Sequence, residues 1–292
     1  MSRHLIPEFA IHLSQLAPVS LAELSGRAAL LTRVDRKYTL TTTQVVDMLP
    51  DLPTDTRVLD IAGRTRHSYQ TTYFDTPRLD SFYSSLRCWR RRFKVRLRNY
   101  TDSGLSFVEV KTRGPRGATV KNRLECSLDK ARENLLDLRA LAWIEDQLVG
   151  VHCAAQALSL APSLHGSYTR TTLLLPGQEA ARATIDWQLR WALPQGAPLR
   201  GQDLVIVETK SGPTPSTLDR VLWARGIRPT RFSKYATALT ALKPELPTNR
   251  WHRTLRRHFS PGQVEVVPPA TSPYSMPLEA PLPANNNLAL AS

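Results

Sequence analysis

Positive charge alternates with apolar side chains in the segment from residue 92 to residue 98. Arginine or lysine stands at every second position, and phenylalanine, valine and leucine stand between them. A β-strand turns successive side chains to opposite faces. The segment therefore presents an apolar face and an opposite face with four cations, Arg92, Lys94, Arg96 and Arg98. A face of this kind is suited to holding a polyanion.

Two further segments repeat the pattern. Residues 107–111 and 120–125 each carry charged residues two positions apart. Such alternation usually means a buried apolar face and a polar face in water, and that ordinary interpretation stays open as the alternative. Three neighbouring strands with cations on the same face favour a positively lined binding surface instead.

Carboxylates occur in the same segments and in others that also look extended. Phosphoryl transfer needs cations that spread the charge of the phosphate oxygens, and carboxylates that hold a divalent metal ion. The sequence offers both, the acids being Asp35, Glu109, Glu125, Asp186 and Glu208.

Strands and helices must bring these residues together. Besides the three basic strands, extended segments are predicted at residues 30–40, 65–75, 166–175, 182–191 and 203–210. Glycines at positions 104, 114 and 117 indicate hairpins between the basic strands, and helices are predicted at 129–149 and 215–225 and before residue 242. Closing such an antiparallel sheet into a barrel would turn cations inward around a wet tunnel and apolar residues outward under helices. We therefore expect an α+β fold built on a closed barrel.

The location of the charge supports an anionic ligand. The formal net charge is +14, and residues 243–292 contain five basic and three acidic residues, so +12 belongs to residues 1–242. Positive charge in the folded part of the chain favours a specific anionic ligand over loose adhesion by a basic tail.

Cysteine usage and hydropathy indicate the compartment. The three cysteines lie far apart without a Cys-x-x-Cys pair, which argues against a disulfide framework and a zinc site. The N-terminus lacks the apolar core of a signal peptide, and nothing approaches the roughly 20 apolar residues of a membrane span. We expect a cytoplasmic protein without a membrane partner.

Seven short motifs, in order, resemble the VTC domain, the polyphosphate polymerase branch of the triphosphate tunnel metalloenzymes. They are RVDRKY (33–38), YFD (73–75), RLR (96–98) with Tyr100, VEVK (108–111), KNR (121–123), ETK (208–210) and FSKY (232–235). The resemblance suggests three parts: an N-terminal helical segment (1–24), a tunnel domain (25–242) and a tail (243–292). Nine of the 22 prolines lie in the tail, so we expect it to be disordered, with any short basic helix near residues 250–259 solvated.

The resemblance implies an eight-stranded antiparallel tunnel. Such an enzyme transfers the γ-phosphate of ATP to a polyphosphate chain with Mn²⁺ or Mg²⁺. By analogy, the residues expected to act on the transferred phosphate are Lys37, Arg96, Arg98, Lys111, Lys121, Lys210 and Lys234. Those expected to bind substrate are Arg123, Tyr168, Arg170, Arg182 and Arg231, and those expected at the metal are Glu208, Asp35 and Glu109.

Three positions depart from the family's pattern. Arg231 stands where the family often has lysine, which keeps the charge but changes the geometry. The first strand reads Arg33-x-Asp35-x-Lys37 where relatives have Glu-x-Glu-x-Lys, so one acid is lost and the other is shortened. These changes bear on the metal-binding role of that strand.

Other functions remain open at this point. A triphosphatase of the same fold would transfer the phosphoryl group to water, and a polyanion receptor would keep the cations without turnover. Glu208 beside Lys210 argues mildly against the receptor, because a receptor needs no metal ligand. Nucleic-acid binding comes last, because the basic strands interleave with valine, leucine and one phenylalanine and not with the aromatic platforms of single-strand binders.

Overall fold

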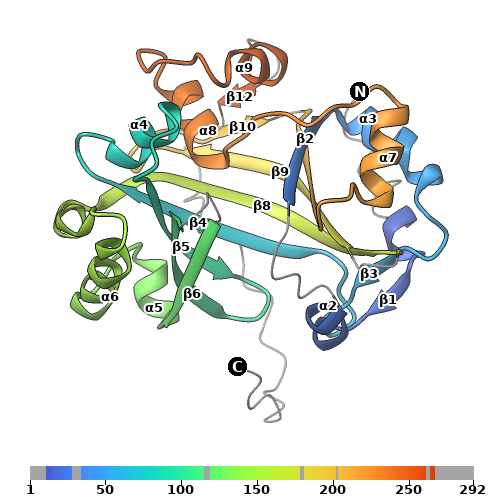
Figure 1. The fold of residues 1–292 in the computed structure, drawn as a ribbon, viewed down its shortest axis with the longest axis horizontal. Helices are drawn as coiled ribbons and strands as arrows, with labels where there is room; N and C mark the ends of the chain where they lie inside the picture. Colours follow the sequence, from blue (N-terminus) through green and yellow to red (C-terminus); the bar gives the residue numbers. More distant parts are fainter. Residues whose placement is uncertain are drawn as a thin grey trace.

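The computed structural model describes residues 11–27, 34–114, 119–177, 181–201, 203–260 and 264–266. Within them, helices surround one large, strongly curled β-sheet (Figure 1). Neighbouring strands of its main path are all antiparallel. In spatial order they are β2 (Val34–Leu40), β11 (Val205–Ser211), β9 (Ala181–Ala192), β8 (Ala161–Leu175), β4 (His67–Asp75), β5 (Phe93–Tyr100), β6 (Leu105–Arg113) and β7 (Thr119–Cys126).

Four short strands extend this sheet at its margins. β1 (Ala17–Val19) pairs in parallel with β3 (Arg57–Leu59), and β3 joins β8. β10 (Leu199–Gly201) lies between β9 and β12 (Val264–Val266). β1 corrects the expectation that the N-terminal segment is helical throughout, because its backbone hydrogen bonds go to a neighbouring strand; residues 1–10 lie outside the described residues.

The closed barrel expected from the sequence is not observed. Among the described residues, β2 pairs only with β11 and β7 only with β6, so the sheet is an open half-barrel. The free edge strand β7 exposes Lys121, Asn122 and Arg123, and charged residues on an exposed edge discourage further pairing. The α+β class and the antiparallel eight-strand path are confirmed, and the closure is corrected to an open curl.

Helices cover the convex face of the sheet. The longest, α6 (Leu138–Val149), packs with α5 (Leu128–Arg132) against β5 and β6, where Phe93, Val95 and Leu97 are buried. Full burial of each such side chain stabilises the fold by roughly 1.5–3 kcal/mol. This confirms the apolar face predicted for the basic strand.

Three more groups of helices complete the shell (Figure 1). α3 (Thr42–Met48), with the 3₁₀ turn Leu49–Asp51, and α7 (Thr217–Ala224) pack on the outer side of β2, β11 and β9. α4 (Asp80–Leu86), α8 (Lys234–Leu242) and α9 (His252–His258) share a second core, and α2 (Leu21–Arg27) lies beside β1 and β3. A further 3₁₀ segment, Ala154–Ser159, precedes β8. No helix in the described ranges is long and apolar enough to cross a membrane.

The helix predicted at 129–149 is interrupted. Asn134 adopts a left-handed conformation with φ of 58°, which ends α5, and the Asp137 carboxylate then caps α6 by accepting a hydrogen bond from the Ala140 amide at 2.8 Å. Asparagine tolerates this conformation, and aspartate is a favoured N-cap.

The expectation of a disordered tail is wrong for residues 243–260. Trp251 is only 4% exposed and its ring lies 5.8 Å from that of Phe82, while His258 is 1% exposed. The apolar surface of α9 thus helps to cover the core around α4 and α8. Of the remaining tail, residues 261–263 and 267–292 lie outside the described residues.

Candidate anion-binding trough

The concave face of the curled sheet, here called the trough, gathers the charged residues. Residues directly opposite one another on paired strands project to the same face. Tyr73 of β4 lies opposite Arg96 of β5, and Arg96 lies opposite Glu109 of β6, so these three side chains project to one face. The remaining pairs continue this face across the sheet. The side chains on this face include Asp35, Lys37, Tyr69, Tyr73, Lys94, Arg96, Arg98, Tyr100, Glu109, Lys111, Lys121, Arg123, Tyr168, Arg170, Arg182, Asp186, Glu208 and Lys210.

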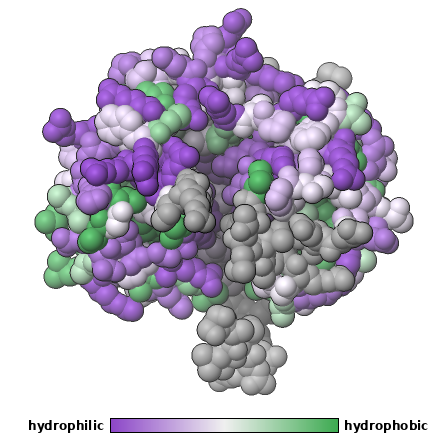
Figure 2. All heavy atoms as spheres, viewed as in Figure 1, coloured by the Kyte–Doolittle hydropathy of each residue, from purple (hydrophilic) through white to green (hydrophobic). Residues whose placement is uncertain are grey.

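Hydrophilic residues also predominate on the face of the molecule shown in Figure 2, where they border a recess near its centre. What distinguishes the trough is the pairing of its charges inside the curl.

Glu109 is the counter-ion for three cations. Its carboxylate accepts from Arg96 Nε at 2.6 Å and lies 2.5 Å from Lys121 Nζ and 3.8 Å from Arg98 Nη1. Burial alone would raise the pKa of Glu109, but Arg96, Arg98 and Lys121 together hold it well below its usual range. All of these contacts are with cations, so Glu109 of β6 is placed to fix cationic side chains of the two neighbouring strands, β5 and β7.

Asp186 plays the same part on the other side of the trough. Arg170 donates to both of its oxygens, at 2.6 and 2.8 Å, and Lys234 donates to one of them from the first position of α8. Although burial opposes it, these two cations lower the pKa of Asp186 to about 2. Asp186 thus ties α8 to the sheet through Lys234.

Glu208 and Lys210 face the trough from β11. Lys210 Nζ donates a hydrogen bond to Glu208, and in the ladder with β2 Glu208 lies opposite Lys37 and Lys210 lies opposite Asp35. Burial works against ionisation of Glu208, but Lys37 and then Lys210 bring its pKa well below the usual range. The carboxylate is therefore charged and surrounded by cations.

Burial and neighbouring positive charges destabilise the protonated form of several lysines in the trough. Desolvation, followed by the charge of Lys37, lowers the pKa of Lys111 to about 8. Desolvation and then Lys37 and Lys111 lower the pKa of Lys94 still more clearly. No carboxylate of the described residues lies within ion-pairing distance of Lys37, Lys94 or Lys111, so an anion between them would relieve their repulsion.

The donor set for a divalent metal is small. Among the described residues there is no group of three or more His, Cys, Asp or Glu side chains that could hold a metal ion. Asp35 and Glu208 project from adjacent strands to the same face, and both act electrostatically on Lys111 and Lys210. Carboxylate oxygens suit Mg²⁺ and Mn²⁺, and Mg²⁺ typically takes one or two carboxylates together with substrate phosphates and water. The two carboxylates therefore fit a metal ion that takes its other ligands from water or a bound phosphate.

Aromatic rings support the arginines of the trough. Tyr69 stacks on Tyr168 with a centroid distance of 5.2 Å, and the Arg170 guanidinium lies 5.1 Å from the Tyr69 centroid. Arg98 lies 5.6 Å from the same ring, and Lys234 lies 4.7 Å from Tyr168. These tyrosines come from β4 and β8, so the fold adds aromatic contacts to cations such as Arg98, whose own strand, β5, interleaves with valine, leucine and one phenylalanine.

The structure brings most of the predicted site residues together, but two occupy its margins. Arg123 is exposed and lies 4.8 Å from the Phe107 ring, and Arg231 is exposed in the loop before α8. Arg182 faces the trough opposite Lys210. Lys94 and Asp186 belong to the cations and acids that the sequence offers, but the resemblance assigned no role to them or to Tyr69; alternation with apolar neighbours was the available signal for Lys94 and Asp186.

A curled antiparallel sheet with a cation-rich concave face is suited to holding phosphate-like polyanions. Residues 32–243 match the VTC domain family, and the chain belongs to that family. This confirms the resemblance seen in the sequence and supports a function related to triphosphate or polyphosphate.

Several proteins of known structure also resemble this chain, at low sequence identity. No curated protein matches the chain. A protein from Vibrio parahaemolyticus described as an adenylate cyclase candidate is 16% identical over 73% of this chain and 87% of its own, with a TM-score of 0.34. HpAC1 from Hippeastrum, an adenylyl cyclase candidate described as having a dominant triphosphatase activity, is 14% identical over 74% and 98%, with a TM-score of 0.43. A conserved hypothetical protein from Pyrococcus furiosus is 10% identical over 70% and 98%, with a TM-score of 0.36.

Proposed function

We propose that this protein is a metal-dependent polyphosphate polymerase that transfers the γ-phosphate of ATP to the end of a polyphosphate chain. Membership of the VTC domain family supports a reaction of triphosphate or polyphosphate. The single observation that carries the proposal is the trough itself. Cations from strands that are distant in sequence converge there, beside carboxylates that face the same way.

The cations act by binding and orienting phosphate. Lys37, Lys94 and Lys111 provide positive charge that no described carboxylate neutralises within ion-pairing distance. A bound triphosphate would supply the neutralising negative charge. Arg96 and Arg98 are held by Glu109, so their guanidinium groups are positioned before substrate arrives. Preorganised cations stabilise charge that develops in the transition state without having to reorganise.

In the proposed reaction a terminal oxygen of the polyphosphate chain attacks the γ-phosphorus of ATP. A bond forms between them, the bond to the β-phosphate oxygen breaks, and ADP leaves with the electron pair. Asp35 and Glu208 would hold a divalent ion, which supplies a Lewis acid for the phosphate oxygens. Lys210, which is hydrogen-bonded to Glu208, would share a phosphate with that ion.

Two alternatives share the trough. A triphosphatase would use the same residues with water as the acceptor, and a polyphosphate-binding protein would use the cations alone. The printed description of HpAC1 concerns that protein, and its low similarity carries no argument here. The placement of Glu208 beside Lys210 favours an enzyme, because cations alone would suffice for binding. We expect no specific nucleic-acid partner, because the cations lie on the concave face, which a flexible chain of phosphates follows more easily than a rigid duplex.

The test is incubation of the purified protein with ATP and either Mn²⁺ or Mg²⁺, with free phosphate and long-chain polyphosphate both measured. We expect chains. Free phosphate alone would support the triphosphatase, and neither product together with tight triphosphate binding would support the binding protein. The variant Arg253→Ala, which removes an exposed cation of α9 outside the trough, is the matched control and should retain wild-type turnover.

A further inference from the structure

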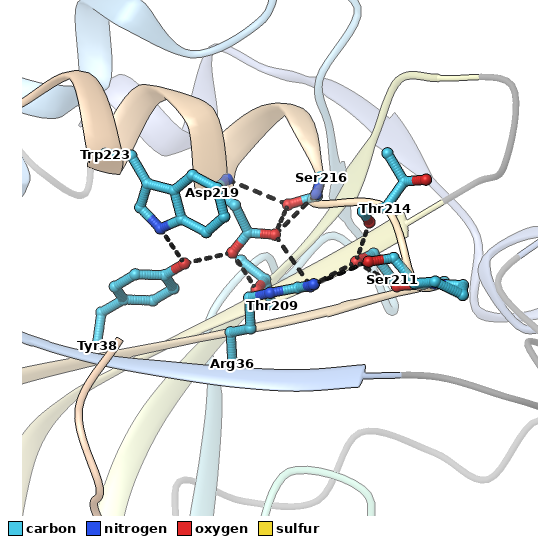
Figure 3. A network of polar contacts seen from close by, with 10 residues as sticks. Arg36, Tyr38, Thr209, Ser211, Thr214, Ser216, Asp219 and Trp223 are labelled. Atoms are coloured by element: carbon cyan, nitrogen blue, oxygen red, sulfur yellow. Dashed lines mark hydrogen bonds and ion pairs between the residues drawn. The ribbon is translucent and has the colours of Figure 1, made fainter. Parts of the chain in front are cut away.

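A buried carboxylate on the convex side of the sheet gathers the residues that flank the trough pair Lys37 and Glu208. Tyr38 of β2 and Thr209 of β11 point away from the trough, and each donates a hydrogen bond of 2.6 Å to Asp219 Oδ1 (Figure 3). Arg36 Nη1 lies 3.6 Å from Asp219 Oδ2. The side chains next to Lys37 and Glu208 along their strands are therefore fastened to a single group on α7.

Asp219 is fully buried and its acceptor capacity is in use. Its Oδ2 also accepts from the Ser216 amide at 2.7 Å and from the Ser216 hydroxyl at 2.8 Å, and the Asp219 amide donates to Ser216 Oγ at 3.2 Å, which completes the N-terminal capping box of α7. Trp223 of the same helix donates to the Tyr38 hydroxyl at 3.0 Å. The network joins one helix to two strands (Figure 3).

The register of β2 against β11 needs a side-chain contact of this kind to hold it. Among the described strands β2 pairs only with β11, and its other edge receives a backbone hydrogen bond from Thr230 to the Lys37 carbonyl. A one-residue slip is opposed by the hydrophobic pattern, because it would turn Tyr38 into the trough. A two-residue slip keeps every side chain on its own face, so the pattern does not oppose it.

Asp219 opposes that second slip. Two residues of strand measure about 7 Å, so a shift of this size would carry both Arg36 and Tyr38 away from the carboxylate. In the trough, the same shift would separate Lys37 from Glu208 and Asp35 from Lys210. Only the observed register satisfies the network and brings these two trough pairs together.

We propose that Asp219 is a positioning residue that fixes the register of β2 against β11 and thereby places Lys37 and Asp35 for triphosphate binding. The consequence for binding rests on the proposed function, whereas the register lock itself does not. Asp219 acts through the strand, because it faces away from the trough and touches no substrate.

The test compares hydrogen exchange of residues 34–40 with triphosphate affinity in Asp219→Asn. The amide group brings N–H donors to a site surrounded by donors, so the network cannot be satisfied. We expect faster exchange confined to β2 and its contact with β11, and triphosphate binding at least ten-fold weaker. Tyr38→Phe, which removes one donor and keeps the ring, should change both measurements in the same direction by less and provides a folded variant if Asp219→Asn does not fold.

The matched control is Asp137→Ala, which removes the cap of α6 away from β2. It should lower overall stability while leaving exchange of residues 34–40 and triphosphate affinity at wild-type values. Unchanged exchange of β2 in both Asp219→Asn and Tyr38→Phe would overturn the lock, and faster β2 exchange with unchanged affinity would overturn its role in positioning. Absence of triphosphate binding by the wild-type protein would instead contradict the proposed function, and the exchange data would still decide the lock.

Discussion

Desolvation and then the charge of Lys37 of β2 lower the pKa of Lys111 of β6, although five strands separate β2 from β6 along the sheet. The curl of the sheet brings the two ammonium groups near one another across the trough. Two like charges held in this way make a site that is unfavourable when empty and favourable when an anion lies between them. The free protein is thus prepared for an anion without any need for the sheet to close.

Triphosphate binding should weaken as pH rises above about 8. The pKa values of Lys111, Lys121 and Lys234 are each lowered to about 8, chiefly by desolvation. A bound anion favours the protonated lysines, so binding takes up protons near this pH and loses its cations at higher pH. Isothermal titration calorimetry from pH 7 to pH 10 at constant ionic strength would measure this loss of triphosphate affinity.

Lys111→Arg gives the control for this pH dependence. A guanidinium stays charged throughout the range, so the variant should bind triphosphate at pH 9.5 with less loss than the wild-type protein. An affinity that does not change between pH 7 and pH 9.5 in the wild type would show that these lysines make no contact with the ligand.

Glu208→Gln should lower turnover by orders of magnitude while triphosphate binding persists. The change removes the carboxylate that is proposed to hold the metal and keeps the shape and the surrounding cations. Steady-state assays with Mn²⁺ and calorimetry without metal separate the two effects. Glu245→Gln, an exposed carboxylate after α8, is the matched control. Wild-type turnover of Glu208→Gln would place the metal elsewhere, with Asp35 the next candidate.

Arg96→Ala and Arg98→Ala should each weaken triphosphate binding by more than ten-fold. Both guanidinium groups are largely buried and lie beside Glu109, where ion pairs with phosphate are screened less than the exposed pairs that contribute about 0–1 kcal/mol. Arg256→Ala, which changes an exposed arginine of α9, should leave the affinity unchanged. Losses in Arg96→Ala and Arg98→Ala no larger than that of Arg256→Ala would contradict the assignment.

Polyphosphate should displace triphosphate at physiological salt far better than duplex DNA of equal total charge. The cations lie inside the curl, where a flexible chain of phosphates reaches them and a rigid duplex does not. Competition measured by displacement of a labelled triphosphate decides this. Equal displacement by DNA would mean that the cations form an open basic patch, and the enzymatic proposal would lose its main support.

Trp251→Ala should lower the free energy of unfolding by about 3–5 kcal/mol, the range for loss of a buried aromatic side chain. The ring is almost fully buried against Phe82, in the region that the sequence suggests is disordered. Chemical denaturation would measure the loss, with His252→Ala on the exposed side of α9 as control. For the same reason, truncation after Leu242 should destabilise the fold. A truncated protein as stable as the wild type would contradict the packing of residues 243–260.

The sequence alone determined which side chains share a face. Alternation is local, because the backbone of a strand turns each residue opposite to the last, so the cationic face from Arg92 to Arg98 and its apolar reverse could be predicted without knowing the neighbours. The family could likewise be recognised, because its motifs keep their order along the chain. The roles assigned to the individual residues stay predictions.

Tertiary structure decided which charges meet. The pairing of Asp186 with Lys234, or of Glu109 with Lys121, depends on how far the sheet curls and where α8 docks, and strand periodicity contains neither quantity. Asn134 interrupts a helix that its apolar spacing favours, and Trp251 is buried because a distant surface around Phe82 is there to receive it. Whether the barrel closes is decided in the same way, since closure requires β2 and β7 to meet, and strand alternation says nothing about the distance between the two edges of a sheet.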